Sequence, residues 1–316
     1  MSLTLVVLAA GMGSRYGGLK QIDPVGPSGE TVLDYAVFDA LRAGFDRVLF
    51  VIRRDFEDLF RAQIGARYEG KITVDYVFQV LDALPTGFTT PAGREKPWGT
   101  GHAVWCARDA LKGNFAVINA DDFYGADSFN RLATFLPAPP PAGINHGDNL
   151  TSGNHPPAPA TTPTPPAFAI IGFRLANTLS EHGAVSRGIC ATNSAGLLAS
   201  IVETHGITPA EVGAGPGHQF SSDTLVSMNC WGFTPALFAG LDQQFREFLS
   251  ARANEPKSEF YLPAAVSTMI ARGETIVHVL PTESAWFGIT FREDKPRVQA
   301  ALAELVDAGR YPEKLF

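Results

Sequence analysis

Runs of apolar residues alternate with amphipathic segments through most of this chain. Short apolar and β-branched runs in the first half predict strands at residues 3–8, 47–52, 72–78 and 115–119. Between these runs, apolar positions at helical spacing predict helices at residues 31–43, 56–64 and 99–111. Strands and helices that alternate in this way predict a mostly parallel sheet covered by helices on both faces.

The same alternation resumes after an interruption. Residues 137–166 are rich in Pro, Ala, Thr, Asn and Gly and have no apolar periodicity, which predicts a long, exposed and mobile insertion. Further strands are predicted at 167–174, 197–203, 225–233 and 275–281, and helices at 235–250, 259–271 and 296–305. Asp294 is expected to cap the last helix. Without internal repeats, the pattern favours a single domain over residues 1–316.

Composition narrows the class of protein. Apolar residues make up 45% of the 316 residues, enough for a large globular core, and the net charge of −7 argues against a nucleic-acid surface. The three cysteines, Cys106, Cys190 and Cys230, have neither a metal-binding spacing nor the pattern of a disulfide framework, which favours a reducing cytoplasm. We expect neither a signal peptide nor a membrane span, because no basic leader and no long apolar run is present.

The most specific motif follows the first predicted strand. There the chain enters a glycine-rich turn that also contains Arg15 and Lys20. Glycines allow backbone N–H groups to approach an anion, and the two cations would neutralise it, so the turn predicts a phosphate site. The turn is not a dinucleotide fingerprint, because Tyr16 occupies the place of the third glycine, and it lacks the Gly-Lys-Ser/Thr of a Walker loop.

The form Gly11-x-Gly13-x-Arg15, followed closely by Lys20, resembles the signature of the sugar-1-phosphate nucleotidyltransferases, part of the glycosyltransferase-A-like nucleotidyltransferase superfamily. The resemblance implies an α/β protein with a three-layer α/β/α Rossmann-like fold and a mostly parallel mixed central sheet. It also implies that the turn wraps the triphosphate of a nucleoside triphosphate. Arg15 and Lys20 would then be catalytic, and Ala10, Gly11 and Gly13 would bind the nucleotide.

A candidate metal ligand follows the strand at 115–119. Ligands of parallel sheets bind beyond the carboxyl ends of strands, and a carboxylate there suits Mg²⁺. Asp121 lies at this position, in a segment that resembles the family's Gly-Asp motif with Ala120 in place of glycine. Asp122 is the weaker candidate. The alternative for Asp121 is a carboxylate that caps the next helix.

Two segments are candidates for nucleoside recognition. Gln79 ends the strand at 72–78, and its amide can pair with the edge of uracil or thymine. The segment Gly99-Thr100-Gly101-His102 begins a predicted helix and resembles a segment of bacterial N-acetylglucosamine-1-phosphate uridylyltransferases. By that resemblance Gly99 and Thr100 contact base and sugar, whereas His102 is expected to be a helix-start residue and not a catalytic base.

Three residues are candidates for the sugar. Gly188 and Glu203 resemble the pair that lines the family's sugar pocket, and Asn229 matches a sugar-contacting asparagine. A strand residue whose amide is satisfied within the protein is the alternative for Asn229. Relatives often carry a lysine just after the glutamate, but here the next residues are Thr204 and His205, so the cation for the sugar phosphate stays unassigned.

The second metal ligand is also open. Residues 287–290 resemble the strand on which relatives supply this ligand. Thr290 occupies the position that corresponds to the ligand. Because a threonine hydroxyl is a poor Mg²⁺ ligand, either Asp294 or Asp223 would replace it, or the metal would rest on Asp121, phosphates and water.

Together these features predict a cytoplasmic, Mg²⁺-dependent nucleotidyltransferase that forms a nucleotide-sugar and pyrophosphate from UTP or dTTP and a sugar 1-phosphate. The partners are small molecules, with no nucleic acid and no membrane, and a homo-oligomer is left open. Three alternatives stay in view: a cytidylyltransferase of the same fold with another acceptor, a nicotinamide-dependent oxidoreductase, and an inactive nucleotide-binding sensor.

Overall fold

The computed structural model describes residues 3–11, 23–136, 165–180, 183–215, 217–288 and 294–316. Some of the residues predicted to be functional lie outside these ranges, namely Gly13, Arg15, Lys20, Thr290 and nearly all of the proline-rich insertion. The helices are α1 (Val32–Arg42), α2 (Glu57–Gln63), α3 (Thr100–Cys106), α4 (Ala126–Phe135), α5 (Leu237–Arg252), α6 (Leu262–Ala271) and α7 (Lys295–Asp307). Short 3₁₀ turns occur at η2 (Arg54–Phe56), η3 (Gly65–Tyr68), η4 (Leu175–Thr178) and η5 (Pro209–Glu211).

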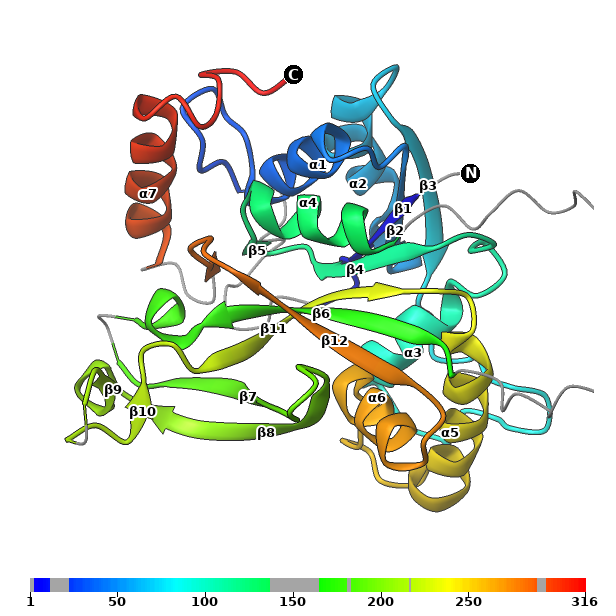
Figure 1. Ribbon diagram of the computed structural model, residues 1–316. Helices are drawn as coiled ribbons and strands as arrows, with labels where there is room; N and C mark the ends of the chain where they lie inside the picture. The colour runs from blue at the N-terminus through cyan, green and yellow to red at the C-terminus, as the bar shows by residue number, and fades with distance from the viewer. Residues whose placement is uncertain (1–2, 12–22, 137–164, 181–182, 216, 289–293) are drawn as a thin grey trace, which may run out of the picture.

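The main sheet has the strand order β12-β6-β11-β4-β1-β2-β3, and β7 and β8 join it at β11 (Figure 1). Its strands are β1 (Thr4–Leu8), β2 (Arg47–Ile52), β3 (Thr73–Phe78), β4 (Phe115–Asn119), β6 (Ala167–Arg174), β7 (Val185–Thr192), β8 (Leu198–Ile207), β11 (Leu225–Phe233) and β12 (Ile276–Thr282). β1 to β4 are parallel, whereas β11 runs antiparallel to both β4 and β6. The sheet is therefore mixed around a parallel half that comes from the first half of the chain, as predicted.

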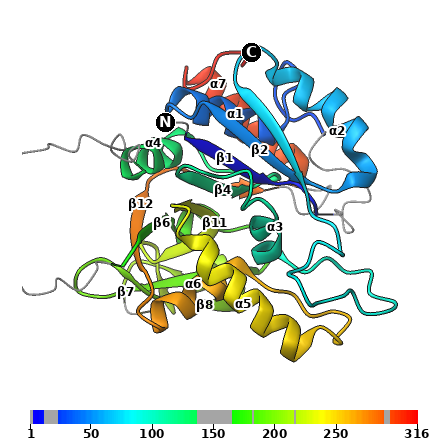
Figure 2. The same ribbon diagram turned by 90° about the vertical axis from the view of Figure 1, so that its right-hand side faces the viewer.

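Helices cover both faces of this sheet (Figures 1 and 2). α1, α2 and α4 contribute to the core on one face, and α3, α5 and α6 to the core on the other. Along β1, Leu5 and Val7 belong to the first core and Val6 to the second. A strand buried on both faces is apolar at every position, which explains why residues 3–8 show no alternation. The three-layer α/β/α architecture is thus confirmed.

Two predicted helix boundaries and one predicted helix cap were wrong, and one strand was missed. α3 ends at Cys106, several residues before the expected end, because the chain turns at Ala107 and Ala110. α6 begins at Leu262 and not at residue 259, because Phe260 is hydrogen-bonded to the start of α3 and Tyr261 is extended. Asp294 precedes α7 as expected, but its side chain makes no capping hydrogen bond to the helix. β7, in the β7–β8 hairpin, was not predicted.

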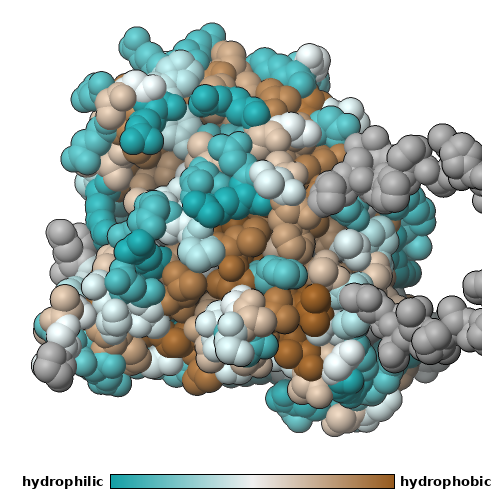
Figure 3. All heavy atoms as spheres, in the orientation of Figure 1, coloured by the Kyte–Doolittle hydropathy of each residue, from teal (hydrophilic) through white to brown (hydrophobic). Residues whose placement is uncertain are grey.

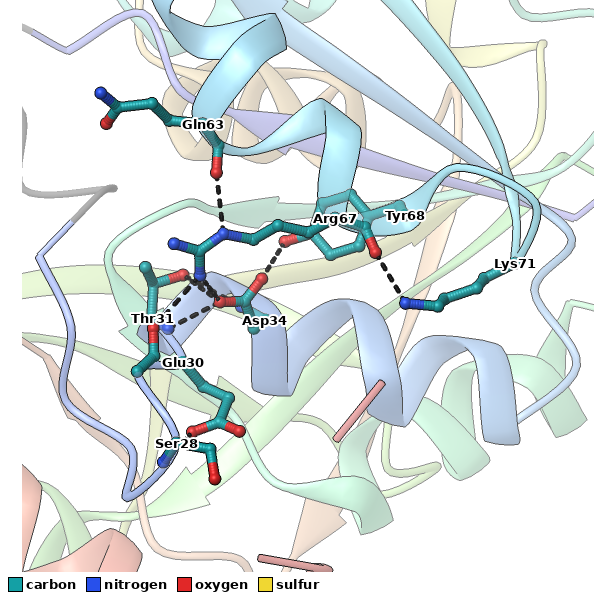
Figure 4. Close-up of polar contacts among 9 residues, drawn as sticks. Ser28, Glu30, Thr31, Asp34, Gln63, Arg67, Tyr68 and Lys71 are labelled. Carbon is teal, nitrogen blue, oxygen red and sulfur yellow. Dashed lines mark hydrogen bonds and ion pairs between the residues drawn. The ribbon is translucent and has the colours of Figure 1, made fainter. Parts of the chain in front are cut away.

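α1 is fixed at its first turn by the buried carboxylate of Asp34 (Figure 4). Its Oδ2 accepts hydrogen bonds from the backbone N–H of Thr31, at 2.7 Å, and from Arg67 Nη1, at 2.5 Å. The hydroxyl of Tyr68 donates to Oδ1 at 2.7 Å. Thr31 and Asp34 form a capping box, so the same carboxylate ends the preceding loop and ties α1 to η3.

Apolar and hydrophilic residues are distributed unevenly over the surface. In the orientation of Figure 1, apolar residues gather across the middle of the face where β12 crosses, with hydrophilic residues on the part above it (Figure 3). No helix within the described ranges combines the length and the apolar character needed to cross a bilayer.

Candidate active site

The carboxyl ends of the parallel strands bring several predicted residues to one edge of the sheet. Ala10 and Gly11 follow β1, Asp121 follows β4, and Gln79 follows β3. The backbone N–H of Ala120 donates to Leu8 O at 3.2 Å, and that of Gln79 donates to Ile52 O at 2.9 Å, so the pairing of neighbouring strands continues up to this edge. The predicted phosphate turn leaves the sheet here, between the positions predicted for metal and nucleoside.

Two adjacent carboxylates follow β4. Asp121 is half-buried and Asp122 is buried, with Asn119 Nδ2 donating to Asp122 Oδ2 at 2.9 Å and the Tyr124 hydroxyl donating to the same oxygen at 3.2 Å. Burial, together with the negative charge of Asp121, raises the pKa of Asp122 to about 7, while the two hydrogen bonds and the charge of Arg187 oppose this shift.

Asp122 lies against the strand for which the family resemblance implied a second ligand. The short strands β5 (Asp122–Phe123) and β13 (Phe287–Gly288) pair, with Asp122 directly opposite Gly288. A Cβ added at Gly288 would lie 2.5 Å from Asp122 Oδ1. A side chain at position 288 would therefore displace this carboxylate, whose charge interacts with that of Asp121.

The other two candidates for a second ligand are less well placed. Asp223 is exposed and forms an ion pair with Arg174, which also binds Glu283. Asp294 lines a cavity beside β13. Among the described residues, no three His, Cys, Asp or Glu side chains are grouped so that they could hold a metal by themselves.

Asn229 connects β11 to β4. Its Nδ2 donates to Asn119 Oδ1 at 2.7 Å, and its Oδ1 accepts from Trp231 Nε1 at 2.9 Å. With φ at 59°, it is the one non-glycine residue of the described ranges in the left-handed region, at an irregularity in the pairing of β11. Both ends of its amide are engaged within the protein, which corresponds to the structural alternative considered for this residue.

The nucleoside candidates lie together at the start of α3. Gly99, with φ at 99°, lies so close to the chain at Phe260 that an added Cβ would be 2.6 Å from Phe260 O. Thr100 Oγ1 accepts a hydrogen bond from the backbone N–H of Leu262 at 3.0 Å. Gln79 Nε2 donates to Gly99 O at 2.9 Å, so the ends of β3 and the start of α3 are joined through this amide.

Gln79 also lines a cavity with a volume of about 510 Å³. Besides Gln79, this nucleoside cavity is lined by Arg53, Arg54, Asp55, Val80, Leu81, Glu95, Pro97, Trp98 and His102. His102 is fully buried, and this burial lowers its pKa to about 4, so the imidazole is neutral at physiological pH. A buried ring with so low a pKa is a weak base, which agrees with the prediction that His102 is no catalytic base.

Gly188 and Glu203 are direct partners across β7 and β8. A Cβ added at Gly188 would lie 3.6 Å from Glu203 Oε2 and 2.8 Å from Ile201 Cγ2. The exposed side chain of Glu203 thus folds back over Gly188, where a larger residue would crowd it. The structure brings together the two residues that the resemblance assigned to one sugar pocket.

Sequence reasoning missed Arg187, the residue before Gly188. Its Nε donates to Thr178 Oγ1 at 3.1 Å, and its guanidinium carbon lies 4.9 Å from the centre of the Trp286 ring. Burial lowers the pKa of Arg187 to about 10, against the opposing influence of the negative charges of Asp122 and Glu203. No sequence pattern marked Arg187, because the family resemblance implies a cation just after Glu203 and not before Gly188.

Arg187 lines the second cavity, of about 440 Å³. This acceptor cavity is also lined by Thr178, Leu179, Ser180, Gly183, Ala184, Val185, Ser186, Trp286, Phe287, Gly288, Asp294, Arg297 and Val298. Gly288, which lines this cavity, is the strand partner of Asp122, so the wall of the cavity packs against that carboxylate. His205 is exposed and does not line the cavity itself, but its Nδ1 lies 2.8 Å from Oγ of the lining residue Ser186.

Comparison with known proteins supports the resemblance. No protein-family model matches the chain. A UTP–glucose-1-phosphate uridylyltransferase of Bacillus subtilis is 27% identical to it over 134 residues, which are 39% of this chain and 45% of that protein. The match thus spans less than half of the length of the curated relative.

Among solved structures, a Bacillus anthracis protein assigned as a glucose-1-phosphate thymidylyltransferase, in complex with sucrose, has a TM-score of 0.60. The two chains are 12% identical and the superposition covers 95% of each, which establishes a common fold over nearly the whole chain. Both proteins are named as sugar-1-phosphate nucleotidyltransferases, so the chain is similar in sequence and in fold to proteins of the family that its motifs resemble.

Proposed function

We propose that this protein is an Mg²⁺-dependent nucleotidyltransferase that joins the nucleotide of UTP or dTTP to a sugar 1-phosphate and releases pyrophosphate. The observation that carries the proposal is the convergence of three features at one sheet edge: the start of the glycine-rich turn after β1, the carboxylates after β4 and the Gln79–Gly99 contact. The similarity to a uridylyltransferase supports it independently.

The reaction needs no general base. A phosphate oxygen of the sugar 1-phosphate attacks the α-phosphorus of the triphosphate, and the bond from that phosphorus to the leaving pyrophosphate breaks. The nucleophile is already ionised near neutral pH, because the second pKa of a phosphate monoester is about 6. Catalysis then depends on alignment and on neutralising the charge of the triphosphate, the role that we assign to Arg15 and Lys20.

The residues after β4 fit the metal that the reaction requires. Asp121 and Asp122 supply hard carboxylate oxygens, and glycine at position 288 leaves the space that the second carboxylate fills. Because the described residues offer no larger group of ligands, phosphate oxygens and water would complete the coordination. When bound, Mg²⁺ would neutralise charge on the triphosphate.

The remaining residues divide between the two substrates. Gln79, Gly99 and Thr100 are assigned to the nucleoside, and Gly188 and Glu203 to the sugar. Asn229, whose amide is engaged by Asn119 and Trp231, is assigned to holding the strands around the sugar site.

Arg187 is our candidate for the cation that faces the acceptor phosphate. It lines the acceptor cavity, and its charge interacts with both Asp122 and Glu203, one acid assigned to the metal and one to the sugar. A guanidinium already bound to Thr178 is held in place, and with five N–H donors it retains some for a phosphate.

A matrix of nucleoside triphosphates against sugar 1-phosphates, with released pyrophosphate as the readout, tests the function. We expect turnover with UTP or dTTP that requires both Mg²⁺ and a sugar 1-phosphate. Turnover with CTP alone would indicate a cytidylyltransferase, and triphosphate binding without turnover would indicate a sensor. Binding of NADH in place of any triphosphate would point to an oxidoreductase and refute the proposal.

A further inference from the structure

The amide of Gln79 is held in one orientation. One of its atoms lies 2.9 Å from Gly99 O, and a backbone carbonyl can only accept a hydrogen bond. The amide atom at this contact must therefore be the nitrogen Nε2. The same nitrogen lies 3.3 Å from Nδ1 of His102, so the imidazole decides where the second N–H of the amide goes.

The imidazole of His102 can only accept at Nδ1. Its Nε2 lies 2.8 Å from Ala83 O, another carbonyl that only accepts, so Nε2 carries a proton. The ring carries no second proton at neutral pH, because its burial lowers the pKa to about 4 and the charges of Arg108 and Arg94 act in the same direction. Nδ1 therefore presents a lone pair, which accepts the second N–H of Gln79.

Only the carbonyl oxygen of Gln79 is then left for a ligand. Both N–H groups of the amide are used, one by Gly99 O and one by His102 Nδ1. Gln79 and His102 both line the nucleoside cavity. An oxygen that only accepts suits the imide N3–H of uracil and thymine, whereas N3 of cytosine carries a lone pair and would repel it.

We propose that His102 is a positioning residue that fixes Gln79 as a hydrogen-bond acceptor and so makes the site select uracil or thymine against cytosine. This inference rests on the proposed function. It goes beyond that function because it assigns base selection to a side chain that need not touch the substrate.

A purely structural role for His102 is the competing explanation. The ring packs between Trp105 and Phe245, with ring centres 6.0 Å and 5.0 Å away, so any substitution also removes aromatic contacts. Two variants separate the roles. His102→Asn retains an acceptor close to the position of Nδ1, and His102→Gln retains a donor close to that of Nε2 but has no acceptor for Gln79. Both lose the ring.

The experiment measures kcat and KM for UTP, dTTP and CTP in the wild type and in both variants, at saturating sugar 1-phosphate. We expect the wild type to favour UTP or dTTP over CTP. His102→Gln should reduce this preference about tenfold, the effect of one hydrogen bond, mainly through a higher KM. His102→Asn should stay within about threefold of the wild type.

Three outcomes would overturn the inference: a wild type that prefers CTP, equal losses of preference in both variants, or no loss in either. If no triphosphate is turned over, the proposed function fails, and calorimetric binding of UTP against CTP to the same three proteins decides the inference. If a variant does not fold, the ¹⁵N spectrum of wild-type histidines decides it: His102 must have a protonated Nε2 and a bare Nδ1 at neutral pH, and a protonated Nδ1 would refute the inference.

Discussion

At the residue scale, the proposed reaction depends on the two cations of the first turn. Replacing Lys20 or Arg15 by alanine should lower kcat by about a hundredfold or more, as expected when a donor that stabilises the transition state is lost. Steady-state pyrophosphate release measures this effect. Arg61→Ala is a matched control, because Arg61 pairs with Glu57 on exposed α2 and should leave kcat unchanged. Wild-type turnover by Lys20→Ala would remove this residue from the mechanism.

The assignment of the two carboxylates after β4 to the metal can be tested one residue at a time. Asp121→Asn should raise the Mg²⁺ concentration needed for half-maximal activity and weaken Mn²⁺ binding in the presence of nucleotide, measured by electron paramagnetic resonance, because a charged oxygen donor is lost. Asp122→Asn should do the same, because both carboxylates are assigned to the metal. Asp58→Asn, on α2, is the control. An unchanged metal requirement in Asp121→Asn would exclude Asp121 from the site.

Replacing Arg187 should affect the binding of one substrate only, the sugar 1-phosphate. Arg187→Gln should raise KM for the sugar 1-phosphate about tenfold and leave KM for UTP nearly unchanged, because it removes a charged donor from the acceptor cavity alone. Arg297→Gln is the control. Arg297 lines the same cavity and its Nη2 donates to Leu179 O, so this variant measures how the loss of any positive charge from the cavity changes KM. Equal effects on both substrates would show that Arg187 only supports the fold.

At the element scale, the start of α3 depends on close contact with the segment before α6. The backbone N–H of Gly101 donates to Phe260 O at 2.9 Å, and that of Phe260 donates to Trp98 O at 2.6 Å. These bonds join residues more than 150 positions apart in the sequence, and they set the position of Gly99 O and therefore of Gln79. The nucleoside site thus depends on two distant segments, and only glycine permits the contact.

Gly99→Ala and Gly44→Ala test this contact as a matched pair. Their φ angles are 99° and 98°, in the range that favours glycine, so alanine is strained at both positions. An added Cβ meets nothing within 4 Å at Gly44 but lies 2.6 Å from Phe260 O at Gly99. Gly44→Ala should cost about 1 kcal/mol in urea denaturation, from backbone strain alone. Gly99→Ala should cost more and also raise KM for UTP; equal costs with unchanged KM would contradict the close packing.

At the scale of the whole molecule, the sequence predicted what local patterns determine. Strands buried on both faces, as at Leu5 to Val7, have continuous apolar runs and were predicted from them. Because Asp121 and Gln79 follow the carboxyl ends of such strands, their position at one edge of the sheet could also be predicted. β7 was missed because Arg187 and Gly188 interrupt its apolar pattern. The proximity of Asp122 to Gly288 and the contact of His102 with Gln79 join segments whose relative placement no local pattern encodes.

The C-terminal segment is coupled to α1 through an acid that responds to pH. Asp39, on α1, is 2% exposed; its Oδ2 accepts from the Tyr311 hydroxyl at 2.6 Å, and its Oδ1 has no partner among the described residues. Burial raises the pKa of Asp39 to about 7, although the hydrogen bond from Tyr311 and the charge of Arg42 oppose this. Because the pKa in the folded state exceeds that of the unfolded chain, the protonated form stabilises the fold.

This stabilisation is fully present below about pH 4 and is lost as the pH rises through about 7. Wild-type protein should therefore lose unfolding free energy between these values, by an amount on the order of a few kcal/mol. Asp39→Asn, which stays neutral, should remove this slope and be the more stable protein at pH 8. Tyr311→Phe, which removes the opposing hydrogen bond, should move the slope to higher pH. Urea denaturation at several pH values measures all three, and parallel curves for wild type and Asp39→Asn would show that Asp39 is already ionised in the folded protein at low pH.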